Sequence, residues 1–161
     1  MSRFRFCPRC ATALEEIIDH EGRNRKKCPA CGYVHYDNPT PVLAAIVEHE
    51  GHVILARNKG WPEDWYGLVT GFLEKDEEPA EGILREVHEE LGLHGEIVSF
   101  VGLHTFRRMN QVLMTWHVRA AGEIVIGDEL AGIKRILPEK VKPWPMGTGR
   151  ALKVWLDQRQ G

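Results

Sequence analysis

The four cysteines constrain most strongly how this chain of 161 residues can fold, because all of them lie within its first 31 residues. They form two Cys-x-x-Cys pairs, Cys7 with Cys10 and Cys28 with Cys31, and the spacer between the pairs has the length expected for a four-cysteine zinc site. So short a segment cannot fold on apolar burial alone, and zinc would supply the missing folding free energy. We therefore predict a zinc-binding module over residues 1–36. Redox dithiols and reduced structural cysteines are the alternatives.

The remaining residues form a second predicted domain, residues 37–161. The segment Asp37–Pro41 contains two prolines and an Asn-Pro step, which disfavour a helix and a central strand, so we place the boundary there. Two apolar runs follow, and a Glu50-Gly51 turn signal between them predicts a strand hairpin over Val42–His49 and His52–Arg57.

Further elements alternate along this second domain. Glutamates and a proline at the start and Gly92 at the end predict a helix over Pro79–Leu91, and an apolar face predicts another over Gly149–Arg159. Glycine, proline and charged residues predict a loop over Asn58–Trp65. The remaining predicted strands are Tyr66–Leu73, Ile97–Phe106, Gln111–Ala120, a short strand and turn at 122–128, and Gly132–Leu137. This order indicates the α/β class, with a mixed sheet and helices packed against it.

Three acids of the first predicted helix form one narrow stripe. Glu86, Glu89 and Glu90 stand at i, i+3 and i+4, while Ile83, Leu84, Val87 and Leu91 occupy a different stripe. Like charges at this spacing repel one another, and a divalent cation would reverse that effect. Carboxylates suit magnesium or manganese better than zinc. A solvated acidic face is the alternative interpretation.

The residues around this stripe favour the metal site. The segment Gly71–Leu93 resembles the whole Nudix box, because every fixed position of that pattern is filled, by Gly71, Glu77, Arg85, Glu86, Val87, Glu89, Glu90, Gly92 and Leu93. Resemblance to the Nudix hydrolase family implies an α/β/α sandwich that hydrolyses a nucleoside diphosphate linked to another moiety. The cysteine module is similar to the zinc ribbon that precedes this domain in NADH pyrophosphatases, including the Cys28–Gly32 and His35-Tyr36 steps.

The resemblance also assigns roles to individual residues. It implies that Glu86, Glu89 and Glu90 hold Mg²⁺ or Mn²⁺ and act in catalysis, with the Gly71 carbonyl as a further ligand. Glu77 and Arg85 would pair and brace the loop against the helix. Glu129 occupies the region where several Nudix enzymes place an additional acid that binds metal or acts as base. An ordinary surface acid is the alternative for Glu129.

Substrate contacts are predicted on segments that would approach the cleft. Aromatic planes stack on nucleotide rings, and we name Trp65, Tyr66 and Phe106 as candidates, with Trp61 and Trp116 on neighbouring segments. Most aromatic residues are core residues, which is the alternative. Arg107 and its neighbour Arg108 would bind a phosphate or ribose, unless they belong to a solvated loop.

The predicted function is cleavage of the diphosphate in an ADP-linked substrate, giving AMP and a second phosphate ester. The Ser-Gln-Pro-Trp motif of NADH pyrophosphatases is replaced here by residues 104–111, His-Thr-Phe-Arg-Arg-Met-Asn-Gln, so ADP-ribose and FAD join NADH as candidates. Two alternatives are a nucleic-acid-binding module built on the zinc ribbon and a hydrolase of NAD-capped RNA.

Charge and hydropathy limit the partners. The formal net charge of −2 gives no bulk attraction to nucleic acid or an anionic membrane, so any contact with a polyanion must be local or mediated by a metal ion. The family resemblance implies a small nucleotide-type substrate. The N-terminal residues lack the apolar stretch of a signal peptide, and no later segment is apolar enough to span a bilayer. We therefore expect a cytoplasmic protein, and the family resemblance implies a homodimer.

Overall fold

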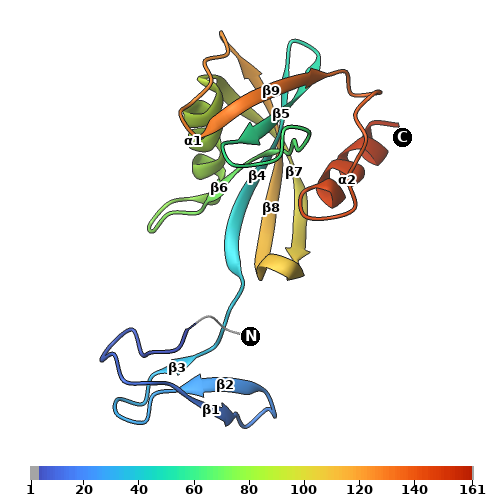
Figure 1. Cartoon of the computed structure of the whole chain (residues 1–161). Helices are drawn as coiled ribbons and strands as arrows, with labels where there is room; N and C mark the ends of the chain where they lie inside the picture. Colours follow the sequence, from blue (N-terminus) through green and yellow to red (C-terminus); the bar gives the residue numbers. More distant parts are fainter. Residues whose placement is uncertain (1–3, 161) are drawn as a thin grey trace. The chain divides into compact units, whose positions relative to one another are not determined.

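The computed structural model describes residues 4–160, which form two compact units that meet between Pro39 and Thr40 (Figure 1). The sequence predicts this boundary after residue 36. The predicted extents of the two domains also include Met1–Arg3 and Gly161, which lie outside the described residues. None of the helices within residues 4–160 is long and apolar enough to cross a bilayer.

The first unit is a three-stranded antiparallel sheet in the order β1 (Glu15–Ile18), β2 (Asn24–Lys27) and β3 (Val34–His35). Its strands are short and mostly exposed. Among the described residues of this unit only Cys7 and Cys28 are buried, so thiols take the place that aliphatic side chains hold in an ordinary core. The unit is the predicted zinc ribbon, and two of its four predicted metal ligands form its core.

The second unit is built on a mixed sheet in the order β7-β8-β4-β5-β9, with β6 also paired to β4. Only the β4–β8 pair is parallel, and the other pairs are antiparallel. The strands are β4 (Thr40–His49), β5 (His52–Asn58), β6 (Val69–Phe72), β7 (His94–Phe106), β8 (Gln111–Ala121) and β9 (Leu130–Ile136).

Central strand β4 sends alternate side chains into two cores, because successive residues of a strand point to opposite faces. Leu43, Ala45 and Val47 pack against helix α1 (Pro79–Leu91), whereas Ile46 belongs to a core completed by helix α2 (Gly149–Gln160). Helices thus cover both faces of the sheet, which confirms the predicted α/β/α sandwich.

One edge of β4 is shared between two strands. The hairpin to β5 closes through Glu50 (φ 46°) and Gly51 (φ 74°), a pair of positive φ values that a tight hairpin turn requires. β5 then pairs only with Val47–His49, while β6 pairs with Val42–Ala45. This divergence of β5 from β6 leaves room beside β4, and the candidate site lies there.

Two predicted strands are corrected. Residues 122–128 do not form a strand; instead the N–H groups of Val125 and Gly127 donate to the carbonyls of Leu91 and Glu90, at 2.9 Å each. The segment therefore satisfies the free carbonyls at the end of α1 rather than a neighbouring strand. The strand predicted from Tyr66 begins only at Val69, because the preceding residues belong to the loop that follows β5.

Candidate active site

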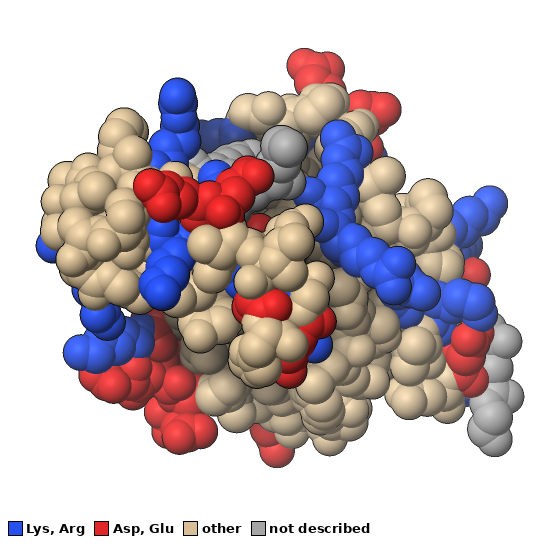
Figure 2. Space-filling view, turned by 90° about the horizontal axis from the view of Figure 1, so that it is seen from below, with Lys and Arg blue, Asp and Glu red and all other residues tan. Residues whose placement is uncertain are grey.

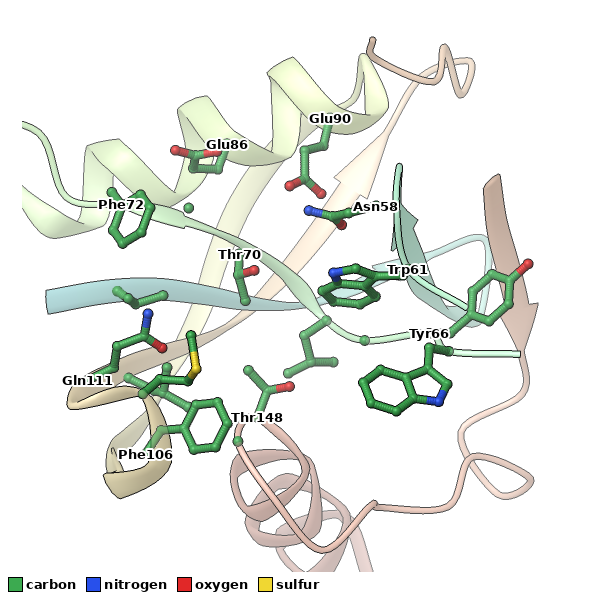
Figure 3. Close-up of a pocket in the computed structure, with 18 of the residues that line it drawn as sticks. Asn58, Trp61, Tyr66, Thr70, Phe72, Glu86, Glu90, Phe106, Gln111 and Thr148 are labelled. Atoms are coloured by element: carbon green, nitrogen blue, oxygen red, sulfur yellow. The ribbon is translucent and has the colours of Figure 1, made fainter. Parts of the chain in front are cut away.

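Helix α1 carries the predicted metal ligands, and its ends are well defined. Pro79 stands in the first turn, and Gly92 ends the helix at φ 67°, where its N–H donates to the His88 carbonyl at 2.8 Å. Ile83, Val87 and Leu91 are fully buried against the sheet. The adjacent stripe, with Glu86 and Glu90, faces the opening beside β4 (Figure 3).

Glu86 lies directly against strand β6. A Cβ atom built on Gly71 would fall 1.8 Å from Cδ of Glu86, far inside any possible contact. Residue 71 must therefore be glycine for the Glu86 carboxylate to occupy this place, and the structure brings these two predicted ligand residues together.

Glu90 is buried without a partner for one oxygen. Its side chain is 5% exposed, and Oε2 has no hydrogen-bond donor among the described residues. Burial, followed by the charges of Glu86 and Glu129, raises the pKa of Glu90 to about 8. Burial likewise raises the pKa of Glu86. Such a carboxylate is costly to keep ionised unless a cation offsets it.

The donor set fits a divalent cation. Glu86 and Glu90 supply hard oxygen atoms, Glu129 contributes to the same negative field, and the unpartnered Oε2 atom offers an open position for a ligand bond. Mg²⁺ and Mn²⁺ prefer such oxygen ligands. Glu89 is exposed, and Arg85 binds its carboxylate.

Arg85 connects the acids of this site to the preceding loop. Its Nε and Nη2 donate to the two carboxylate oxygens of Glu77 at 2.7 and 3.2 Å, which is the predicted pair. Nη1 donates to Glu86 Oε1 and Glu89 Oε2, at 2.8 Å each. The Arg85 guanidinium lowers the pKa of the Glu77 carboxyl by hydrogen bonding. One guanidinium thus holds three carboxylates.

A cavity of about 1200 Å³ opens beside these acids (Figure 3). Trp65, Tyr66 and Phe106 line it as predicted, and Trp61 and Trp144 do as well. Trp116 does not, because it is buried in the core beneath α1. Glu86, Glu89, Glu90 and Glu129 line the acidic end of the same cavity.

Of the two adjacent arginines, Arg108 lines the cavity, whereas Arg107, which we named for a substrate contact, is not among its lining residues. Both arginines belong to the short 3-10 helix Arg107–Met109, in which successive side chains point in directions about 120° apart. Arg108 and Met109 of this turn line the cavity and Arg107 does not, and the pattern of two adjacent arginines does not indicate which of the two lines it.

The sequence does not indicate the neutral polar residues of the cavity. Asn58, Thr70, Gln111 and Thr148 line it, and all four are labelled in Figure 3. They lie on β5, β6, β8 and the turn before α2. Neutral side chains scattered along the chain carry no motif, so only the meeting of these elements identifies them.

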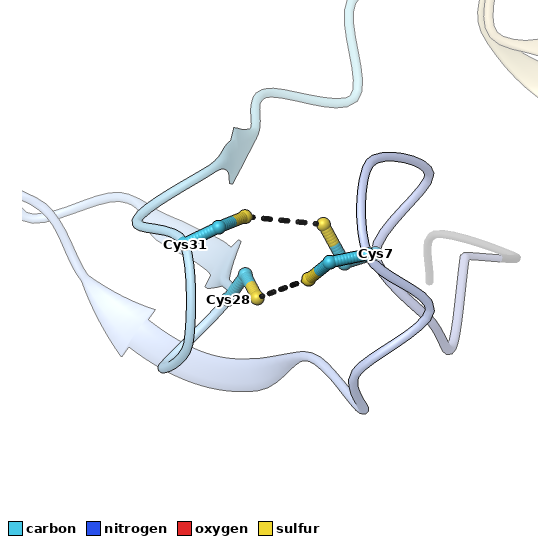
Figure 4. A group of neighbouring side chains, drawn as sticks. Cys7, Cys28 and Cys31 are labelled. Carbon is cyan, nitrogen blue, oxygen red and sulfur yellow. Dashed lines mark hydrogen bonds between the residues drawn. The ribbon is translucent and has the colours of Figure 1, made fainter.

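The four cysteines of the first unit converge (Figure 4). Their Sγ atoms all lie within 4.8 Å of one another, with Cys7–Cys31 and Cys10–Cys28 separations of 3.5 Å. A tetrahedron with zinc–sulfur bonds of about 2.3 Å has edges of about 3.8 Å. Both knuckles have the same turn, in which Ala11 and Gly32 donate to the carbonyls of Cys7 and Cys28 at 2.9 and 3.0 Å. The cluster therefore fits one zinc ion.

Both units match models of known protein families. The NUDIX domain model matches residues 37–153, and the Nudix N-terminal zinc ribbon model matches residues 5–37. The chain belongs to the Nudix family.

Among curated relatives, the NAD-capped RNA hydrolase NudC of Pseudomonas aeruginosa is 30% identical over 162 residues, which cover 98% of this chain and 57% of that protein. NudC of Chromobacterium violaceum is 36% identical over 89 residues, covering 55% of this chain and 32% of that protein. The chain thus spans little more than half the length of the first of these relatives.

Solved structures share the fold. A NUDIX hydrolase from Nitrosomonas europaea superposes with a TM-score of 0.82 at 24% identity, covering 98% of this chain and 93% of that one. An ADP-ribose pyrophosphatase from Streptococcus suis superposes with a TM-score of 0.63 at 18% identity, covering 77% and 94%.

Proposed function

We propose that this protein hydrolyses the diphosphate of an ADP-linked substrate, such as ADP-ribose, FAD or NADH, to AMP and a second phosphate ester. The observation that carries the proposal is the buried, unpartnered carboxylate oxygen of Glu90 beside Glu86, at one end of a cavity lined with aromatic side chains. This arrangement joins a site for a cation to a site for planar rings.

Glu86, Glu89, Glu90 and the Gly71 carbonyl would hold Mg²⁺ or Mn²⁺. When bound, the cation neutralises the diphosphate and polarises its phosphorus–oxygen bonds. Glu129, on the turn after Gly127, is the residue that we propose as an additional catalytic acid or base. Its carbonyl accepts a hydrogen bond from the Lys59 N–H at 2.8 Å, which ties its turn to the end of β5.

Aromatic residues lie on two sides of the acidic end of the cavity (Figure 3). Trp61 and Tyr66 lie on one side, and Phe72 and Phe106 lie on the other. Trp65, the chain neighbour of Tyr66, also lines the cavity. A substrate with organic groups on both sides of its diphosphate would find apolar surface for each of them. This supports an ADP-linked substrate over a nucleoside triphosphate, which carries an organic group at one end of its phosphates only.

The relatives support the same class and one alternative. A fold neighbour is named an ADP-ribose pyrophosphatase, and sequence relatives are named NAD-capped RNA hydrolases. Removal of an NAD cap also cuts a diphosphate attached to AMP, so the chemistry is the same. The formal net charge of −2, however, gives no bulk attraction to RNA, and Figure 2 shows acidic as well as basic side chains at the surface. We therefore keep cap removal and RNA binding as the second candidates.

A substrate panel tests this proposal. We expect kcat/KM for at least one of ADP-ribose, FAD and NADH to exceed that of every nucleoside triphosphate by tenfold or more, because a second bound moiety helps to orient the reacting phosphorus. The measurement is initial rates with Mg²⁺ and with Mn²⁺, including an NAD-capped oligonucleotide. A triphosphate ahead by tenfold, about 1.4 kcal/mol in transition-state stabilisation, contradicts the proposed specificity.

Arg85→Ala tests the proposed bracing role. We expect a 10- to 100-fold loss of kcat/KM together with a loss of about 1–3 kcal/mol in the free energy of unfolding, because the carboxylates that it holds lose charge-assisted hydrogen bonds. Denaturant unfolding and steady-state kinetics measure the two effects. Arg85→Lys retains the charge without the planar fork and should be intermediate. Wild-type stability in Arg85→Ala would exclude the bracing role.

Three further proposals concern the whole chain. The ribbon binds one structural zinc ion, held by the four cysteines.

A site made of four reduced thiols suits a reducing compartment, which supports a cytoplasmic location. The active form is a homodimer, a proposal that rests on the family resemblance and that size-exclusion chromatography with light scattering would test.

A further inference from the structure

Asn58 stands where the apolar face of strand β5 meets the acidic end of the cavity. Ile54 and Ala56 point into the core beneath helix α1, and Asn58 continues the same face by the two-residue period of a strand. Asn58 itself is not part of that core. The side chain is half-buried, lines the cavity, and in Figure 3 lies between Glu90 and Trp61.

The ladder between β5 and β9 is irregular beside Asn58, and the extra residue lies on β9. The pairing of β5 with β9 shifts between Arg57, opposite Gly132, and Asn58, opposite Leu130, so Ala131 is an extra residue in the ladder. Bulges of this kind redirect side chains and occur often beside active sites. The N–H of Lys59, the next residue, donates to the Glu129 carbonyl, which holds the end of β5 against the turn that carries Glu129.

The Asn58 amide is a hydrogen-bond donor that the protein itself does not use. Its side chain has no hydrogen-bond partner among residues 4–160. Of the two arginines that line the cavity, Arg85 is already occupied by Glu77, Glu86 and Glu89, and Arg108 belongs to the short 3-10 helix Arg107–Met109. A diphosphate brought to this end of the cavity faces carboxylates, so each phosphate oxygen that is not neutralised by a cation needs a donor.

We infer that Asn58 is a substrate-contacting residue whose amide N–H donates to a phosphate oxygen of the bound diphosphate, on the side of the site that faces Trp61. The inference rests on the proposed function, because it needs a diphosphate at this site. A neutral amide suits the position: it donates to an anion without adding positive charge that would compete with the cation for the glutamates.

Binding of α,β-methylene-ADP, a nucleotide diphosphate with an uncleavable bridge, tests the inference without turnover. We expect Asn58→Ala to weaken its binding in the presence of Mg²⁺ by about 10-fold or more, measured by calorimetry, since a hydrogen bond to a charged group is lost. Binding of Mn²⁺ alone, measured by electron paramagnetic resonance, should stay within twofold of the wild-type value. Gln158→Ala, which removes an exposed amide from α2, is the matched control and should change neither affinity.

Asn58→Asp distinguishes a phosphate contact from a contact with the cation. The two side chains have the same shape, but the carboxylate cannot donate and adds a charge that repels phosphate. We expect nucleotide binding weaker than in Asn58→Ala and Mn²⁺ binding equal to or tighter than in the wild type.

Three results would overturn the inference. If the nucleotide affinity of Asn58→Ala is within twofold of the wild-type value, Asn58 does not contact the phosphate. If the Mn²⁺ affinity of this variant falls in parallel with its nucleotide affinity, Asn58 supports the metal site instead. Wild-type or tighter nucleotide binding by Asn58→Asp indicates an oxygen ligand to the cation. A wild-type protein that neither binds Mn²⁺ nor releases AMP from any ADP-linked compound would instead overturn the proposed function, and this inference with it.

Discussion

Glu90→Gln is expected to lower kcat by at least a thousandfold while leaving the fold intact. The amide has nearly the same shape as the carboxylate but is a poor ligand for a hard cation. In metal-free protein the variant should be at least as stable as the wild type, because the buried and unpartnered carboxylate, whose pKa is raised to about 8, is replaced by a neutral group. Steady-state kinetics and thermal unfolding without metal measure the two effects.

Measurement of Mn²⁺ binding distinguishes the loss of a metal-ligating side chain from a disruption of the fold. Mn²⁺ should raise the melting temperature of the wild type, because a ligand that binds only the native state stabilises it. The rise should be absent or much smaller in Glu90→Gln. Glu123→Gln, on an exposed segment outside the cavity, is the matched control and should behave as wild type. Wild-type turnover in Glu90→Gln would exclude Glu90 as a ligand.

Cys28→Ser is expected to reduce the zinc content from about one ion per chain to none and to unfold the ribbon. Cys28 is fully buried, and in the described part of this unit only the two buried cysteines occupy a core position. Structural zinc sites contribute about 10–16 kcal/mol of apparent binding free energy, which short strands cannot replace by packing. Metal analysis and the amide spectrum of residues 4–39 measure the change.

The second unit should stay folded when the ribbon loses its zinc ion and unfolds. Its two cores consist of residues from β4 onward, and none comes from the ribbon. Cys28→Ser should therefore retain a cooperative unfolding transition and the ability to bind Mn²⁺. Thr12→Ala, which leaves all four thiols in place, should keep its zinc. Protein prepared without chelator that contains no zinc would contradict the zinc-site assignment.

Most of the fold could be predicted from periodicity and from stop signals. Helix α1 was predicted with the observed bounds, because proline and glycine mark its ends. Residues 122–128 could not be predicted in the same way. Their apolar run looks like a strand, but their N–H groups instead satisfy the end of α1, a partner far away in the sequence. Register and capping across such distances leave no local pattern.

The same distinction between local sequence patterns and contacts between distant segments applies to the candidate site. Charged residues in a fixed motif were found, and the structure brings Gly71, Glu86 and Glu90 to one end of the cavity with Glu129. Arg108 rather than Arg107 faces the cavity because of the phase of a single helical turn. Asn58 belongs to no motif, and only the meeting of the end of β5 with the cavity identifies it.

Identification of the reaction products by mass spectrometry tests the proposed hydrolysis of an ADP-linked substrate. Purified protein is incubated with ADP-ribose, FAD and NADH, with and without Mn²⁺, beside Glu90→Gln. We expect AMP and the complementary phosphate ester from at least one of these compounds, only with the added cation and only from the wild-type protein. Absence of AMP from all three with either Mn²⁺ or Mg²⁺, in protein that binds zinc and unfolds cooperatively, would contradict the proposed function.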